Sequence, residues 1–153
     1  MNTSNCNANI GKDEDVSFEA RPIEHLLALM IQQGTIHANR IRELHPHIES
    51  YSDLYGFLRD YATIRFDPGQ RSGKTTAICR LAAKGDVIVT EPDLILPSDT
   101  EAKIVTRGTK IESLTFYRRI FVDNASWLYS NAEINDLIKE FARSDKQLFI
   151  LVG

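Results

Sequence analysis

Three short segments of the chain are almost entirely apolar, and they constrain the fold more than any other feature. They are Val87–Thr90 (VIVT), Arg119–Asp123 (RIFVD) and Leu148–Val152 (LFILV), and polar and apolar residues do not alternate along them. A strand of this kind has both faces buried, which is typical of a parallel sheet covered by helices on both sides. Helix-like segments separate these strands, as parallel pairing requires. The sequence therefore predicts an α/β fold with a parallel sheet between two helical layers.

Weaker patterns complete this α/β region, which we place at residues 63–153. Two further strands and two helices are expected, at Thr63–Asp67, Ala102–Thr106, Lys74–Lys84 and Asn131–Arg143. Both helices carry apolar residues at helical spacing. Cys79 lies on the first of these helices and is expected in the core, whereas Trp127 is expected to pack at the edge of the sheet.

Before this region the sequence predicts a tail and a small helical unit. Residues 1–17 are rich in Asn, Ser and acidic residues, and they hold too few apolar side chains to offset the entropy of ordering. Residues 18–62 are expected to form helices from Pro22 to Gly34, over 35–44, and after Ser50 or Ser52. This unit would serve docking or self-association, so a homo-oligomer is one expectation.

Composition excludes several classes of protein. The longest apolar runs are too short to cross a bilayer, and the chain opens with no secretory leader, so no membrane association is expected. The two cysteines, Cys6 and Cys79, lack metal-ligand spacing and fit a reducing, cytoplasmic compartment.

The distribution of charge leaves open whether the basic residues of the middle segment contact nucleic acid. The net charge of −3 excludes a strongly basic nucleic-acid coat protein. Residues 71–119, however, hold nine Lys and Arg against six Asp and Glu. Either these charges are scattered and solvated, or some of them contact nucleic-acid phosphates, the candidates being Arg107, Lys110, Arg118 and Arg119.

The segment between the first predicted strand and the following helix carries the clearest chemical signal. It reads DPGQRSGKTT from Asp67 to Thr76. Glycines at 69 and 73 allow the backbone to turn so that several N–H groups face an anion, and the helix adds a partial positive charge at its start. Lys74 is then expected to reach outer phosphates and the Thr75 hydroxyl to bind Mg²⁺. Arg71 either contacts phosphate or projects outward.

A second signal comes 48 residues after Thr75, where the strand RIFVD ends in Asp123. The carboxyl ends of parallel strands meet at one edge of a sheet, so Asp123 should face Thr75. A carboxylate at this position would hold the same Mg²⁺ through water.

With these residues in place, residues 63–153 resemble the P-loop NTPases, and most closely the RecA-like ATPase cores of superfamily one helicases and phage terminase motors. Gly69 to Thr76 (GQRSGKTT) is similar to their Walker A loop, with the first glycine displaced from position 68, where Pro stands. Phe121 to Leu128 (FVDNASWL) is similar to their Walker B strand, and Leu148 to Gly153 to the strand before their third motif. The resemblance implies ATP and Mg²⁺ as ligands, with Gly69, Gln70, Arg71, Ser72, Gly73, Lys74, Thr75 and Thr76 around the phosphates. It also implies that the last strand lies between the phosphate-loop strand and the Walker B strand.

Two departures from the family affect the expected activity. Most such motors have Asp-Glu in Walker B, and the Glu acts as general base, whereas this chain has Asp123 and Asn124. An amide cannot accept the proton, so slow hydrolysis is expected unless Glu91, after the VIVT strand, substitutes. The sequence also ends at Gly153, where a motor would continue into a second domain, so a self-contained helicase is not expected.

We therefore expect Mg²⁺-dependent ATP binding with slow or partner-dependent hydrolysis in nucleic-acid metabolism. Lys74, Glu91 and Asn124 are the catalytic candidates, and nucleic acid or a protein partner would complete the site. The alternative is a degenerate P-loop domain that binds or regulates without catalysis.

Overall fold

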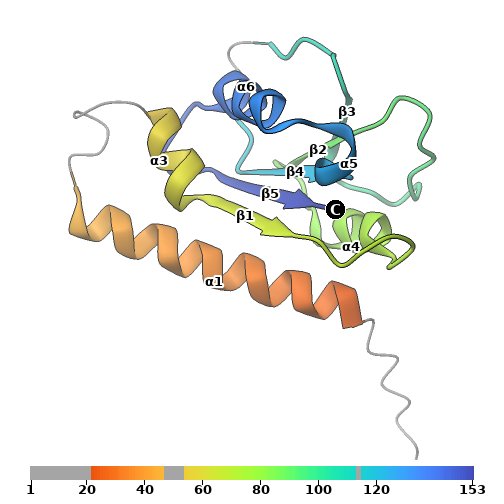
Figure 1. Ribbon diagram of the computed structural model, residues 1–153, viewed down its shortest axis with the longest axis horizontal. Helices are drawn as coiled ribbons and strands as arrows, with labels where there is room; N and C mark the ends of the chain where they lie inside the picture. The colour runs from red at the N-terminus through yellow and green to blue at the C-terminus, as the bar shows by residue number, and fades with distance from the viewer. Residues whose placement is uncertain (1–21, 47–53, 113–114) are drawn as a thin grey trace, which may run out of the picture.

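The computed structural model describes residues 22–46, 54–112 and 115–153, and it contains a five-stranded sheet (Figure 1). The strands are β1 (Thr63–Phe66), β2 (Val87–Thr90), β3 (Lys103–Thr106), β4 (Arg119–Asp123) and β5 (Leu148–Val152). Every pairing is parallel, and the order across the sheet is β1-β5-β4-β2-β3. This confirms the predicted parallel sheet and the predicted place of the last strand, between β1 and β4. The expected tail at 1–17 and the expected cap at Ser50 or Ser52 lie outside the described residues.

Burial along the strands follows their position in the sheet. All residues of β2 and β5 are buried, and so are the last four of β4, whereas β1 and β3 at the edges are partly exposed. The three nearly continuous apolar segments of the sequence are thus the three inner strands, because only these have a neighbouring strand on each side.

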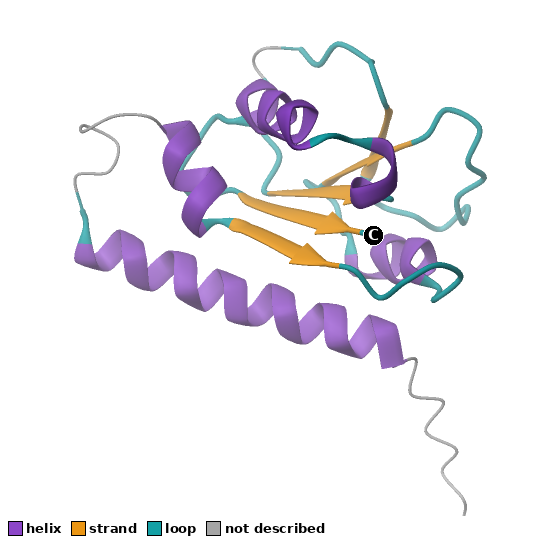
Figure 2. Cartoon of the chain, viewed as in Figure 1, coloured by secondary structure: helices purple, strands orange, loops and turns teal. Residues whose placement is uncertain are grey.

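Helices form a layer on each face of the sheet (Figure 2). On one face, α1 (Pro22–Leu44) packs against α4 (Lys74–Leu81) and β1. On the other, α3 (Leu54–Tyr61) packs against α6 (Asn131–Phe141), and the short α5 (Ala125–Leu128) lies against β5. No helix in the described ranges is long and apolar enough to cross a membrane.

The core lies between these layers and contains the residues that the helical patterns place inward. Ile78 on α4 is fully buried, and Cys79 beside it is buried as expected. On α6 the buried side chains are Ile134, Leu137, Ile138 and Phe141. This helix begins with a capping box, in which the Ser130 side chain accepts from the Glu133 N–H and the Glu133 carboxylate accepts from the Ser130 N–H.

The first helix differs from the prediction. Gly34 does not end it, because α1 runs unbroken from Pro22 to Leu44. The reason is close packing: a Cβ built on Gly34 would lie 2.3 Å from Cδ1 of Ile64 on β1. Glycine is present because α1 approaches β1 closely at this point, and the lost helix propensity is offset by that contact.

This packing predicts whether alanine at position 34 raises or lowers the free energy of unfolding. We expect Gly34→Ala to lower the free energy of unfolding by up to about 2 kcal/mol, because overpacking typically costs about 1–3 kcal/mol and helix propensity returns roughly 1 kcal/mol of this. In an Ile64→Ala background the same change should instead be stabilising, since the clashing atoms are gone. Urea unfolding followed by circular dichroism measures both, with the exposed Gln33→Ala as a control that should shift little. Stabilisation by Gly34→Ala in the wild-type background would contradict the close approach.

Candidate functional site

The turn after β1 and the carboxyl end of β4 meet at one edge of the sheet. β5 pairs with both strands, Phe66 lying opposite Val152 and Asp123 opposite Val152 on the other side. The contact between the two elements is a hydrogen bond, donated by the Thr75 hydroxyl to Oδ2 of Asp123 at 2.7 Å. The structure therefore brings together the two residues that the sequence assigns to a metal.

The turn itself is built from left-handed backbone positions. Gly69, Arg71 and Gly73 have φ values of 85°, 55° and 82°. Oδ1 of Asp67 accepts from the Gly69 N–H at 3.0 Å, and the Ser72 hydroxyl donates to the Gly69 carbonyl at 3.0 Å. Alternation of left-handed and ordinary residues turns successive N–H groups toward one side, which makes a concave site for an anion.

Lys74 begins α4 immediately after this turn. Its side chain is buried, and its ammonium donates to the Gly69 carbonyl at 3.4 Å, so it folds back over the turn. The first N–H groups of α4 have no partner within the helix, as at any helix start. A buried cation, a helix start and a concave turn together favour a ligand with several negative charges.

Asp123 is the buried acid of the site, with 1% of its surface exposed. Burial raises the pKa of its carboxyl above the ordinary value, while hydrogen bonds from Thr75 and the Asn124 N–H, and the nearby Lys74 charge, oppose the rise. A nearby cation would stabilise the charged form of a carboxylate as deeply buried as this one.

The oxygen atoms here fit a small hard metal ion. The Thr75 hydroxyl and the Asp123 carboxylate are ligands of the type that Mg²⁺ takes. Beside them, the Thr90 hydroxyl is buried and has no hydrogen-bond partner, and Thr90 follows Val89, which pairs with Val122. No group of three or more His, Cys, Asp and Glu in the described part of the chain could hold a metal by itself. A metal here would complete its shell with water and ligand oxygens.

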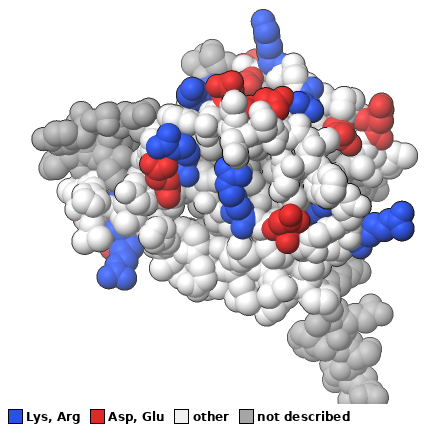
Figure 3. Space-filling view, viewed as in Figure 1, with Lys and Arg blue, Asp and Glu red and all other residues white. Residues whose placement is uncertain are grey.

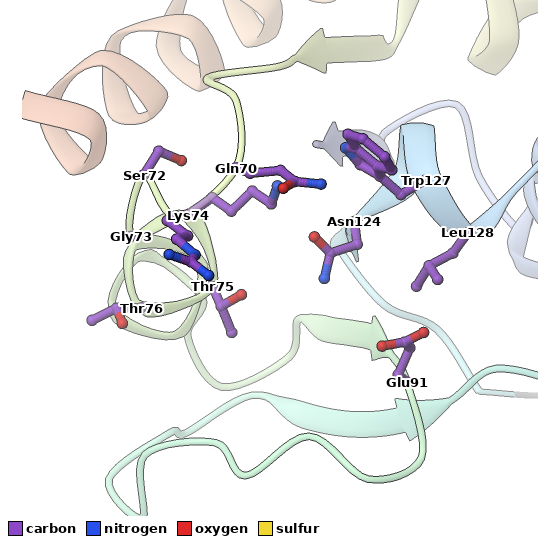
Figure 4. A pocket seen from close by; sticks show the side chains of 11 residues that line it. Gln70, Ser72, Gly73, Lys74, Thr75, Thr76, Glu91, Asn124, Trp127 and Leu128 are labelled. Atoms are coloured by element: carbon purple, nitrogen blue, oxygen red, sulfur yellow. The ribbon is translucent and has the colours of Figure 1, made fainter.

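A pocket of about 400 Å³ opens over this edge (Figure 4). Its walls hold every predicted loop residue except Gly69, namely Gln70, Arg71, Ser72, Gly73, Lys74, Thr75 and Thr76. Glu91 and Asn124 line the opposite side, after β2 and β4, so the pocket also brings these catalytic candidates together. Asp123 lies behind its wall, joined to it through Thr75.

Trp127 and Leu128 also line the pocket, and the sequence did not place them there. Trp127 was expected to pack at the edge of the sheet, but its side chain is 63% exposed. The cause is α5, which the strand and helix patterns missed because it spans only four residues. Asn124 precedes it in the left-handed conformation (φ 53°), which turns the chain away from the sheet. An Asn directly after a strand is the signal that could have indicated this turn.

The end of β5 fixes α5 in place. The Ser126 N–H donates to the Gly153 carbonyl at 2.8 Å, and the Gly153 N–H donates to the Phe66 carbonyl at 2.9 Å. A Cβ at Gly153 would lie 2.8 Å from the Asn124 Cα, so the two backbones are in contact. Residues 153 and 124 therefore hold the far wall of the pocket against the sheet.

Comparison of the chain with protein-family models, curated proteins and solved structures gives no match in any of the three.

The turn at Asn124 can be tested without any ligand. We expect Asn124→Gly to leave the free energy of unfolding nearly unchanged, because glycine adopts positive φ freely. Asn124→Val should lower it by roughly 2 kcal/mol or more, because the usual penalty for a side chain in the left-handed region is about 1–2 kcal/mol and a β-branched side chain is disfavoured further. Thermal or urea unfolding measures both. Equal stability of the two variants would show that residue 124 does not adopt positive φ.

Proposed function

We propose that the protein binds ATP together with Mg²⁺ as a P-loop NTPase with a RecA-like core, and that it hydrolyses ATP slowly or with the help of a partner. The proposal rests above all on the 2.7 Å hydrogen bond between Thr75 and Asp123, which joins the phosphate-loop sequence to the Walker B-like strand. The sequence resemblance gives the class of ligand, and the shape and charge of the pocket are consistent with it.

The turn and Lys74 would bind the phosphate chain. Backbone N–H groups from Gln70 to Gly73 would donate to phosphate oxygens, and the start of α4 would add its partial positive charge. The Lys74 ammonium would exchange the Gly69 carbonyl, 3.4 Å away, for the outer phosphates. This exchange replaces a neutral acceptor by a charged one, which strengthens the hydrogen bond.

Thr75 and Asp123 would hold Mg²⁺, Thr75 through its hydroxyl and Asp123 through water. When bound, the metal would neutralise charge on the transferred phosphoryl group. For this the Thr75 hydroxyl must rotate away from Asp123, which frees both oxygens for the ion.

Hydrolysis needs a group that orients and deprotonates water, and two side chains line the pocket where it would act. Asn124 can orient a water molecule but cannot take its proton. Glu91 can do both, and it lies at the carboxyl end of β2 on the same side of the pocket. Glu91 is exposed and is not fixed in the pocket. We therefore expect slow turnover, which a nucleic-acid or protein partner would raise. The resemblance to helicases and terminase motors suggests a role in nucleic-acid metabolism.

A second function, binding or regulation without catalysis, is favoured by one observation. Asn124 occupies the place of the usual glutamate, and no other carboxylate than Glu91 lines the pocket in the described residues. A module of this kind would bind Mg²⁺-ATP and change partner affinity without turnover.

Binding is tested by removing the buried cation. We expect Lys74→Ala to weaken Mg²⁺-ATP binding by roughly 10- to 150-fold, because a hydrogen bond to a charged group contributes about 1.5–3 kcal/mol. Isothermal titration calorimetry measures the affinity. Lys84→Ala, an exposed lysine outside the pocket, is the matched control and should bind as the wild type does. Absence of any heat with wild-type protein and Mg²⁺-nucleotides would refute the proposal.

Turnover separates the two functions. We expect Asn124→Glu to raise phosphate release at least tenfold, because it restores a carboxylate beside the attacking water, general-base catalysis being worth about 10²–10⁴-fold in rate. Glu91→Gln should abolish the slow wild-type rate while leaving ATP affinity within twofold. Phosphate release is followed with and without single-stranded nucleic acid. No turnover in the wild type under either condition would favour the non-catalytic module.

A further inference from the structure

A second cavity, of about 470 Å³, lies at the amino ends of the strands, whereas the proposed nucleotide site lies at their carboxyl ends. Arg118 precedes β4, Arg119 begins it, and Lys146 precedes β5, so these three stand at the amino ends of the strands. The other wall is α1, which contributes Thr35, Asn39 and Arg42. The two sites therefore lie at opposite ends of β4 and β5, and neither shares a lining residue with the other.

The walls of this cavity carry four cationic side chains and no acidic one among the described residues. Two of them are held by acids behind the wall. Arg119 is paired with the buried Asp86, and its guanidinium also donates to the Leu81 carbonyl at 2.9 Å. Arg42 donates to the Asp145 carbonyl at 2.8 Å and lies 3.6 Å from the Asp145 carboxylate. These pairs fix both guanidinium groups in place.

The other two cations are available to a ligand. Arg118 forms a long ion pair with Asp86, its Nε lying 3.6 Å from Oδ1, but its side chain is 61% exposed, so its guanidinium can still donate to a ligand. Lys146 is exposed and has no ion-pair partner within the described ranges. Four cations against two acids leave an excess of two positive charges around the cavity.

This excess is local. In the view of Figure 3, acidic and basic side chains are mixed across the visible face, and neither sign forms a broad patch. The protein as a whole carries a net charge of −3, so general attraction of polyanions is not expected. A polyanion would have to bind through a specific cluster of cations such as this one.

We propose that this cavity binds the backbone phosphates of single-stranded nucleic acid. Guanidinium forks suit phosphate oxygens, and Arg118 and Lys146 stand just before the neighbouring strands β4 and β5, so both can donate to the phosphates of one nucleic-acid chain. The cavity has the volume of a small-ligand pocket, which admits a phosphate with its sugar, and a flexible single strand can place these groups there more readily than a stiff duplex. The site itself is independent of the nucleotide pocket; only the choice of nucleic acid among polyphosphates rests on the proposed function.

The test is binding of a fluorescein-labelled oligothymidylate to the full chain without nucleotide, followed by fluorescence anisotropy over a range of salt. Arg118→Glu/Lys146→Glu should weaken binding at least tenfold and reduce the slope of log affinity against log salt by about 1.4, since each single-strand phosphate contact contributes about 0.7. Arg118→Gln/Lys146→Gln should also weaken binding, and this variant replaces the charge reversal if that variant does not fold. Arg59→Glu/Lys139→Glu, which changes the net charge equally on α3 and α6, is the matched control and should bind within twofold of wild type.

Three results would overturn the proposal: no binding by the wild type, pocket variants that bind as well as the control, or loss of binding in both. Competitors identify the ligand. If inorganic tripolyphosphate at equal phosphate concentration displaces the oligothymidylate, the cavity is a site for free phosphates. If polyglutamate displaces it, the cavity is a site for an acidic protein. Either result would also contradict binding of nucleic acid. Lys74→Ala should retain oligonucleotide binding, so failure of the nucleotide proposal is distinguishable from failure of this one.

Discussion

The parallel pairing of β5 with both β1 and β4 is the constraint on which the rest of the structure depends. It sets the carboxyl ends of β1 and β4 on either side of one central strand, in matched register at Val152. Thr75 and Asp123 are far apart in the sequence, and this pairing, with the turn before α4, brings the Thr75 hydroxyl within hydrogen-bond distance of the carboxylate. The same pairing places the basic residues before β4 and β5 together at the other edge. Both candidate sites are therefore consequences of a single strand order.

Polar groups are buried at the carboxyl ends of the strands, around Lys74 and Asp123, at a cost that packing elsewhere must offset. Lys74 and Asp123 are both buried, and the Thr90 hydroxyl has no partner. Leaving such groups without full hydrogen bonding typically costs about 1–3 kcal/mol each. The apolar inner strands and the helices on both faces supply the stability that permits this. A ligand with phosphate oxygens and a metal ion would satisfy these groups together, which supports the proposal that this part of the protein binds a ligand.

Much of the fold was readable from local sequence, because the apolar strands and the phosphate-loop segment are short and their patterns do not depend on distant residues. VIVT, RIFVD and LFILV became the three inner strands, and the place of the last strand, between β1 and β4, was the one expected. The predictions that were wrong involve tertiary contacts. Gly34 has the local signature of a helix end, and only the approach of Ile64 explains its place inside α1. Trp127 follows a buried strand and was expected to pack at the edge of the sheet, but the left-handed turn at Asn124 and the short α5 place it at the pocket. The cation cluster was visible only in part, since Arg118 and Arg119 are adjacent in sequence whereas Arg42 and Lys146 join them through folding.

The central claim is that the turn from Gly69 to Thr75 surrounds a triphosphate, with a metal ion between Thr75 and Asp123. A crystal structure of the protein with a non-hydrolysable ATP analogue and Mg²⁺ tests it most directly. We predict that the Lys74 ammonium leaves the Gly69 carbonyl for the outer phosphates, and that the Thr75 hydroxyl turns from Asp123 to the metal. A structure in which the analogue binds elsewhere, or in which this turn keeps its present hydrogen bonds with saturating analogue in the crystal, would contradict the account.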